Sequence, residues 1–171
     1  MLPLLAFLLV PGVVGCGGDT VSGSPTTSAV AKEDLFDPCT GVPDEALLAA
    51  GVDPATEVPG ILGRPMESGW KICGWDNSQY FLVVFSTSHT VAEFESKPGN
   101  VEFEDVTMAG RQGRRFKVEG ASKDLLCDVV FPTRHGVIQL RISNKPITGE
   151  REDPCVVLDR VGDFIVPVFP E

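Results

Sequence analysis

The chain has 171 residues, with 14 basic and 24 acidic side chains, so its formal charge at pH 7 is −10. Apolar residues make up 43% and charged residues 22% of the sequence, which is ordinary for a globular protein. The length suits one domain of roughly 100–150 residues. The acidic balance disfavours nucleic-acid binding, because an acidic surface repels phosphate backbones.

The first fifteen residues contain no charged side chain, and residues 2–10 form an apolar run that only Pro3 interrupts. The run is shorter than the roughly 20 apolar residues that cross a bilayer, but it is typical of the apolar part of a signal peptide. It leads into Val13-Val14-Gly15-Cys16, which resembles a bacterial lipobox. We therefore expect a lipoprotein signal peptide at 1–15. Diacylglycerol and an acyl chain such as palmitate on Cys16 would anchor the protein to the extracytoplasmic face of the cell membrane.

The alternative is a buried apolar N-terminal segment in which Cys16 occurs by chance. Signal peptides normally begin with Lys or Arg, and no basic residue precedes Cys16. On the lipoprotein interpretation, we expect the true start codon to lie upstream of Met1.

Residues 16–33 are dominated by Gly, Ser, Thr, Pro and Ala. Such a segment buries too little apolar surface to offset its ordering entropy, which predicts a flexible tether. A single globular domain is then expected over residues 34–171.

The predicted elements begin with a short helix at 43–51 and a Pro- and Gly-rich connection at 53–68. Three strand pairs follow, at 70–75 with 80–86, 102–108 with 114–119, and 125–132 with 136–143. A short helix is predicted at 90–96 and an amphipathic helix at 153–166. This pattern predicts an α+β fold, with a mostly antiparallel sheet of about six strands from consecutive hairpins, flanked by the short N-terminal helix and the amphipathic C-terminal helix.

Side-chain patterns assign faces to some of these strands. Residues 80–85 are apolar on both faces, which favours a central strand. Phe116 and Val118 alternate with charged residues, which predicts one dry face and one wet face. Trp70 and Trp75 flank Cys73 and are expected to pack in the core beside a disulfide.

Four cysteines are left once Cys16 is assigned to the lipid, and an even number in an exported chain predicts disulfides. They are Cys39, Cys73, Cys127 and Cys155. A zinc site is the alternative, but zinc ligands usually include close Cys-x-x-Cys pairs, which the sequence lacks. A catalytic cysteine would need a neighbour that lowers its pKa, and neither His89 nor His135 lies in a recognisable pairing motif.

Four cysteines allow three pairings. Cys39 and Cys155 each follow Asp-Pro, where Asp can cap a helix and Pro fits the first helical position. Cys73 and Cys127 lie in strand-like stretches. Joining helix starts to strands favours Cys39–Cys73 with Cys127–Cys155, and each bridge would contribute about 3–4 kcal/mol by chain entropy.

Motifs for chemistry are scarce. The sequence has no Gly-x-Ser-x-Gly and no His-Glu-x-x-His motif, and we predict no metal site and no cofactor. His89 and His135 are expected in turn or cap positions.

The basic residues Arg111, Arg114 and Arg115, with Lys117 nearby, are a candidate site for an anionic headgroup or polymer. The alternative is that they occupy outward positions of a hairpin and pair with acidic residues of the facing strand. Those acidic residues are Glu102, Glu104 and Asp105.

Three motifs follow the lipobox in a fixed order: Asp37-Pro38-Cys39, Cys73-Gly74-Trp75 and Asp153-Pro154-Cys155. Together they resemble the actinobacterial lipoprotein family called domain of unknown function 3558, over about residues 35–168. The resemblance implies a cell-envelope lipoprotein of mycobacteria and their relatives, with no established activity.

These observations favour a membrane-anchored binding or sensor-like accessory module, which holds an unknown ligand or envelope protein and is not an enzyme. One alternative is an envelope hydrolase or transferase with a site built around Asp128 and His135. Another is a purely structural envelope protein, against which an enclosed apolar cavity would argue.

Overall fold

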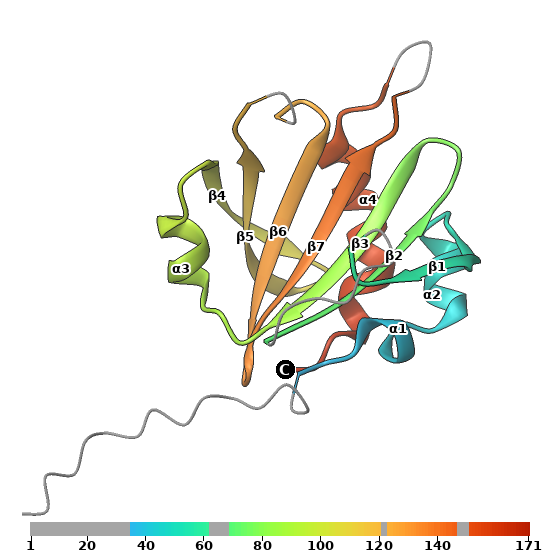
Figure 1. Ribbon diagram of the computed structural model, residues 1–171, viewed down its shortest axis with the longest axis horizontal. Helices are drawn as coiled ribbons and strands as arrows, with labels where there is room; N and C mark the ends of the chain where they lie inside the picture. Colours follow the sequence, from blue (N-terminus) through green and yellow to red (C-terminus); the bar gives the residue numbers. More distant parts are fainter. Residues whose placement is uncertain (1–34, 62–68, 121–122, 147–150) are drawn as a thin grey trace, which may run out of the picture.

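The computed structural model describes residues 35–61, 69–120, 123–146 and 151–171. These residues form one seven-stranded antiparallel sheet in the order β1-β2-β3-β7-β6-β5-β4 (Figure 1). The strands are β1 (Asp53–Pro59), β2 (Trp70–Asp76), β3 (Tyr80–Thr87), β4 (Asn100–Met108), β5 (Arg111–Val118), β6 (Leu126–Thr133) and β7 (Gly136–Asn144). The predicted signal peptide, Cys16 and the tether lie outside the described residues.

Helices cover the two faces of the sheet unequally. They are α1 (Pro38–Gly41), α2 (Asp44–Ala49), α3 (Val91–Ser96) and α4 (Pro154–Ile165), and α4 continues into a 3-10 turn, η2 (Val166–Val168). In Figure 1, α4 runs behind the sheet, α1 and α2 lie beside β1 and β2, and α3 lies near β4 and β5. None of the helices in the described segments is long and apolar enough to pass through a membrane.

The α+β class and the three hairpins, β2–β3, β4–β5 and β6–β7, are confirmed. The β6–β7 hairpin inserts between β3 and β5, which makes β3 a central strand as expected. The β4–β5 turn is tighter than predicted: it consists of Ala109 and Gly110, both with positive φ, and β5 begins at Arg111.

The seventh strand, β1, corrects the prediction of a long connection after the first helix. Pro54 and Pro59 make this segment resemble a connection in the sequence, because prolines remove strand hydrogen bonds. Prolines are nevertheless tolerated in strands at the edge of a sheet. β1 is such an edge strand, mostly exposed, and its pairing with β2 shifts register between Asp53 and Val58.

Both edges of the sheet are irregular. The opposite edge strand, β4, also shifts register, between Val101 and Glu104, where Glu102 has a φ of 56°. An extra residue in one strand of a pair bends that strand and increases its twist.

The main core lies between the sheet and α4. Ile138, Leu140 and Ile142 of β7 share one face, as predicted, and all three are buried. They pack with the buried stripe of α4, which consists of Val157, Leu158, Val161 and Ile165. Burying each such side chain contributes about 1.5–3 kcal/mol, so this contact is the principal stabilising interface of the domain.

The start of α4 follows from its sequence. The Asp153 carboxylate accepts a hydrogen bond from the Cys155 amide (2.7 Å), and Pro154 occupies the first turn. Further along, Gly162 leaves room for Met108 of β4, since a Cβ at Gly162 would lie 1.8 Å from the Met108 Sδ.

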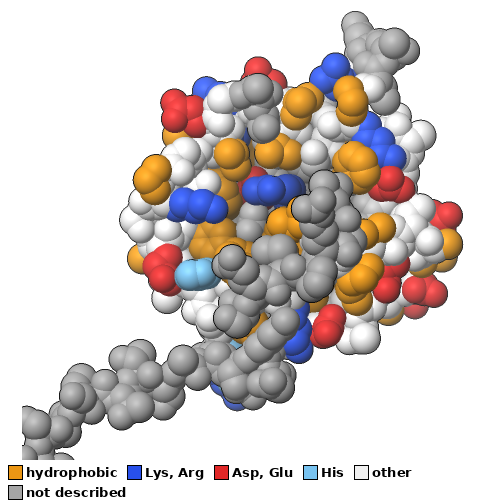
Figure 2. Space-filling model, viewed as in Figure 1, with side chains coloured by type: hydrophobic (Ala, Val, Ile, Leu, Met, Phe, Trp, Pro, Cys, Tyr) orange, Lys and Arg blue, Asp and Glu red, His pale blue; other side chains and the backbone are white. Residues whose placement is uncertain are grey.

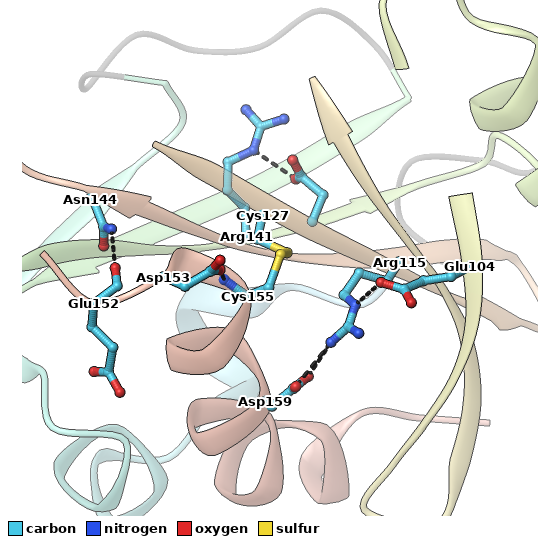
Figure 3. The surroundings of a disulfide bond; sticks show 10 residues. Glu104, Arg115, Cys127, Arg141, Asn144, Glu152, Asp153, Cys155 and Asp159 are labelled. Atoms are coloured by element: carbon cyan, nitrogen blue, oxygen red, sulfur yellow. Dashed lines mark hydrogen bonds and ion pairs between the residues drawn. A yellow bond between two sulfur atoms is a disulfide. The ribbon is translucent and has the colours of Figure 1, made fainter. Parts of the chain in front are cut away.

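The two predicted disulfides are confirmed. Cys39–Cys73 ties α1 to β2, and Cys127–Cys155 ties β6 to the start of α4 (Figure 3). In the part of the chain that is described, one group of metal-binding residue types comes together, Cys39, Glu57 and Cys73. Its two sulfur atoms are bonded to each other and are therefore not free to coordinate an ion.

Candidate functional site

The face of the sheet opposite α4 carries a second, smaller apolar cluster. Phe116, Val130 and Val137 of the sheet are buried there beneath Phe94 of α3. The dry side of β5, predicted from Phe116 and Val118, therefore faces α3. The side of β5 predicted to be wet faces α4, where Arg115 forms an ion pair with Asp159.

Helix α3 is positioned by its first residues. The Thr90 hydroxyl accepts a hydrogen bond from the Glu93 amide, and the Glu93 carboxylate accepts one from the Thr90 amide, which forms a capping box. His89 also lies close to this carboxylate (Nδ1 to Oε1, 3.2 Å), and its ring is 5.4 Å from that of Trp70. Phe94 is thereby directed onto the sheet.

A cavity of about 200 Å³, here called the aromatic pocket, opens between α3 and this face. Its apolar walls are Ile61, Trp70, Ile72, Phe85, Phe94 and Phe116, and its polar lining residues are Lys97, Asn100, Gln139 and Arg141. Figure 2 shows this face of the molecule, with basic and apolar side chains next to one another near its middle.

Strand register explains this arrangement. Directly paired residues of antiparallel strands point to the same face. Ile72 pairs with Phe85, and Phe85 pairs with Gln139, so these three form one row across the sheet. In an adjacent row Phe116 pairs with Asp128, and Asp128 pairs with Arg141.

Asp128 is completely buried beneath the pocket. Its Oδ1 accepts hydrogen bonds from Gln139 Nε2 (2.5 Å) and Arg141 Nε (2.7 Å). Its Oδ2 has no hydrogen-bond partner among the residues that the structure describes. Burial raises the pKa of the Asp128 carboxyl, and the positive charge of Arg141 opposes that shift.

Arg141 and Lys97 give the pocket its positive charge. Arg141 uses Nε for Asp128, while its two terminal nitrogens have no hydrogen-bond partner within the described segments. Its guanidinium lies 5.3 Å from the ring centroid of Phe85. Lys97 forms no ion pair with any described residue and lines the same pocket.

The model of one protein family, described as "Protein of unknown function (DUF3558)", matches residues 11–167. The chain belongs to this family. None of the curated proteins and none of the solved structures matches the chain. The family that the three cysteine motifs indicated is therefore confirmed.

In this DUF3558 protein, Arg114 and Arg115 do not share a binding surface. Adjacent residues of a strand point to opposite faces, so Arg114 lies on the α3 side and Arg115 on the α4 side. Arg114 pairs with Asp105 (3.1 Å), and Arg115 pairs with Glu104 (2.6 Å) and Asp159 (2.8 Å; Figure 3). The alternative of cross-strand pairing is confirmed for Glu104 and Asp105.

Arg111 also has partners within the chain. Its guanidinium donates to the backbone carbonyls of Phe169 (3.1 Å) and Pro170 (2.7 Å), and burial lowers its pKa. Glu102, the third acidic residue expected to pair with this cluster, instead forms an ion pair with Lys123. The cationic surface expected from Arg111, Arg114 and Arg115 is thus divided among three places.

The structure does not bring Asp128 and His135 together. His135 is exposed in the β6–β7 turn, as expected, whereas Asp128 lies five residues before Thr133, the last residue of β6. At about 3.3 Å per residue, that is roughly 17 Å along the strand.

The two tryptophans differ in position. Trp75 is buried in the main core, as expected, but Trp70 points to the other face and lines the aromatic pocket. The expectation that both pack in the core beside the disulfide is therefore wrong for Trp70.

Proposed function

We propose that this protein is a ligand-binding module of the cell envelope, held at the extracytoplasmic face of the membrane by the lipid on Cys16. Its ligand would occupy the aromatic pocket and would be held there without chemical conversion. The observation that carries the proposal is the pairing of aromatic walls with the terminal nitrogens of Arg141, which have no hydrogen-bond partner among the described residues.

The composition of the pocket supports binding. Small-molecule sites are concave, mostly apolar and equipped with a few polar groups that fix orientation. Asp128 and Phe85 hold the Arg141 guanidinium in place before a ligand arrives, so little side-chain entropy is lost on binding. A cavity of about 200 Å³ favours a small ligand, or one group of a larger ligand.

Trp70 offers a direct test of binding. In a full-length Trp75→Phe variant, Trp70 is the one tryptophan of the chain, so its fluorescence reports on the pocket. We expect small molecules extracted from the native envelope to shift this emission in a saturable manner.

The matched control is the Trp70→Phe variant, in which only Trp75 of the main core emits. Its fluorescence should not respond to the same fractions. If no fraction changes Trp70 emission, or if both variants respond equally, the aromatic pocket is not the binding site.

The anchor is tested separately in cells. A chain expressed from its native gene should incorporate an alkyne analogue of palmitate and sediment with membranes. Cys16→Ala should abolish the label and release the protein, because two or more acyl chains are needed for stable anchoring. Membrane association that survives Cys16→Ala without label would contradict the proposed anchor.

A further inference from the structure

We infer that the ligand of the aromatic pocket is a small organic acid, whose anionic group binds Arg141 and Lys97 and whose apolar body lies among the aromatic rings. This inference deepens the proposed function and rests on it.

The charges around the pocket favour an anion. Among the residues that the structure describes, Lys97 and Arg141 are the two charged ones that line it. Asp128 is hydrogen-bonded to Arg141 from below, so Lys97, Arg141 and Asp128 together carry one net positive charge even when Asp128 is ionised. Other acidic residues of α3 are already engaged, since Glu93 pairs with His89 and Glu95 with Arg114. This local excess stands out in a chain whose formal charge is −10.

The geometry of Arg141 suits a carboxylate. A guanidinium presents five N–H donors in a planar fork, and its two terminal nitrogens match the two oxygens of a carboxylate. The Asp128 carboxylate accepts a hydrogen bond from Nε and thereby fixes the orientation of the guanidinium, and the Phe85 ring lies 5.3 Å from it. Asp128 is thus a positioning residue, which acts on the ligand through Arg141.

The rings define the apolar part of the ligand. Phe94 lies between Trp70 and Phe116, with ring centroids 6.3 Å and 6.0 Å away, in tilted or edge-on arrangements. A similar set of rings could hold an organic cation by cation–π attraction. Lys97 and Arg141 line the same pocket, however, and their positive charges would repel an organic cation.

Three ring probes of similar size and different charge test the inference on the full-length chain: phenylacetate, phenylacetamide and protonated phenethylamine. Titrations followed by Trp70 fluorescence in the Trp75→Phe background give each affinity. We expect phenylacetate to bind at least about tenfold more tightly than phenylacetamide, because hydrogen bonds to charged groups are the stronger ones. Phenethylamine should bind most weakly.

Arg141→Gln should lower the affinity for phenylacetate by a larger factor than the affinity for phenylacetamide, because Arg141 binds a carboxylate more strongly than an amide. The matched control is Arg115→Gln, which removes an arginine of the opposite face that is paired with Glu104 and Asp159. It should alter none of the three affinities. Circular dichroism of both variants checks that the fold is intact.

Two sources could supply such an acid, a small free acid or a fatty acid of the membrane. Hexanoate and hexadecanoate distinguish them, since a cavity of about 200 Å³ predicts no gain in affinity for the longer chain. A gain that Arg141→Gln abolishes would identify the fatty acid as the source.

The inference is overturned if phenylacetamide or phenethylamine binds as tightly as phenylacetate, or if phenylacetate does not bind. Either result leaves the proposed function intact, provided that envelope fractions still shift Trp70 emission. If those fractions also fail, the proposed function is overturned as well.

Discussion

Asp128 shows how one buried residue organises a site. Its carboxylate is withdrawn from water, and one oxygen binds both Gln139 and Arg141. A buried acid without full hydrogen bonding is costly, which makes Asp128 a candidate for a role in binding. Here the arrangement fixes the cation that faces the aromatic pocket.

The raised pKa of Asp128 predicts a pH dependence of stability. The folded chain binds a proton at Asp128 more readily than the unfolded chain does, so stability falls as the pH rises from about 3.8 through the folded pKa. Asp128→Asn removes this dependence. Urea unfolding of both proteins should show the free-energy difference, native minus variant, decreasing over that window. A difference that increases with pH would contradict the assignment.

Glu93→Gln provides a comparison of opposite sign. The Thr90 amide, followed by His89, lowers the pKa of the Glu93 carboxyl below its ordinary value of 4.5. Its contribution is therefore present above that pH and is lost as the pH falls through the folded pKa. In the same experiment, the free energy of unfolding of the native protein minus that of Glu93→Gln should increase with pH.

Single side chains are the hardest feature to place from the sequence. The adjacency of Arg114 and Arg115 suggests one site, but adjacent strand residues face opposite sides of a sheet. In the sequence, Asp128 stands out only as a candidate partner for His135. What matters is the residue opposite Asp128 on the next strand, Arg141. The short turn between β6 and β7 sets this register, so the predicted hairpin carried a signal for the pair.

Among the elements, α4 depends on a close approach to β4 at Gly162. Gly162→Ala would place a methyl group against Met108, and overpacking of this kind costs about 1–3 kcal/mol. We expect chemical denaturation to show that the free energy of unfolding falls by that amount. The methyl group would otherwise favour the helix, since Ala has a higher helix propensity than Gly.

The Met108→Ala background separates these two effects. Without the Met108 side chain, Gly162→Ala should no longer destabilise and should increase the free energy of unfolding by about 0.5–1 kcal/mol. Equal losses in both backgrounds would show that contact with Met108 is not the cause.

Elements with strong local signals were predicted well. Asp-Pro at the starts of α1 and α4, and Ile138, Leu140 and Ile142 on one face of β7, each have a simple physical basis. β1 was missed because an exposed edge strand needs no apolar alternation and tolerates proline.

For the whole molecule, two disulfides tie the helices to the sheet. They close loops of similar length, with sequence separations of 34 and 28 residues. Replacing either pair, Cys39 with Cys73 or Cys127 with Cys155, by alanine should lower the free energy of unfolding by about 3–4 kcal/mol. Denaturation of each double variant measures the loss.

Removal of both bridges should leave the domain close to unfolding, because typical domains are stable by only 5–15 kcal/mol. If a reducing agent leaves the thermal midpoint of the native chain unchanged, the disulfides do not stabilise the folded domain by the expected amount. A variant with both pairs replaced distinguishes that result from incomplete reduction.

The aromatic pocket could not be predicted at this scale. Its lining residues come from five strands, from α3 and from short segments between elements, and no two of its aromatic residues are neighbours in the sequence. The pocket exists because β7 inserts beside β3 and because α3 lies over only part of that face. Both depend on long-range pairing, which local patterns do not encode.

The irregular outer strands also affect how copies of the protein meet. An open sheet offers free backbone N–H and C=O groups along both borders, and these can recruit strands from neighbouring molecules. Here the prolines of β1 and the bulge and acidic side chains of β4 interrupt that template. At high concentration, copies of the protein should therefore resist pairing their sheets edge to edge, which is a common route to aggregation of sheet proteins.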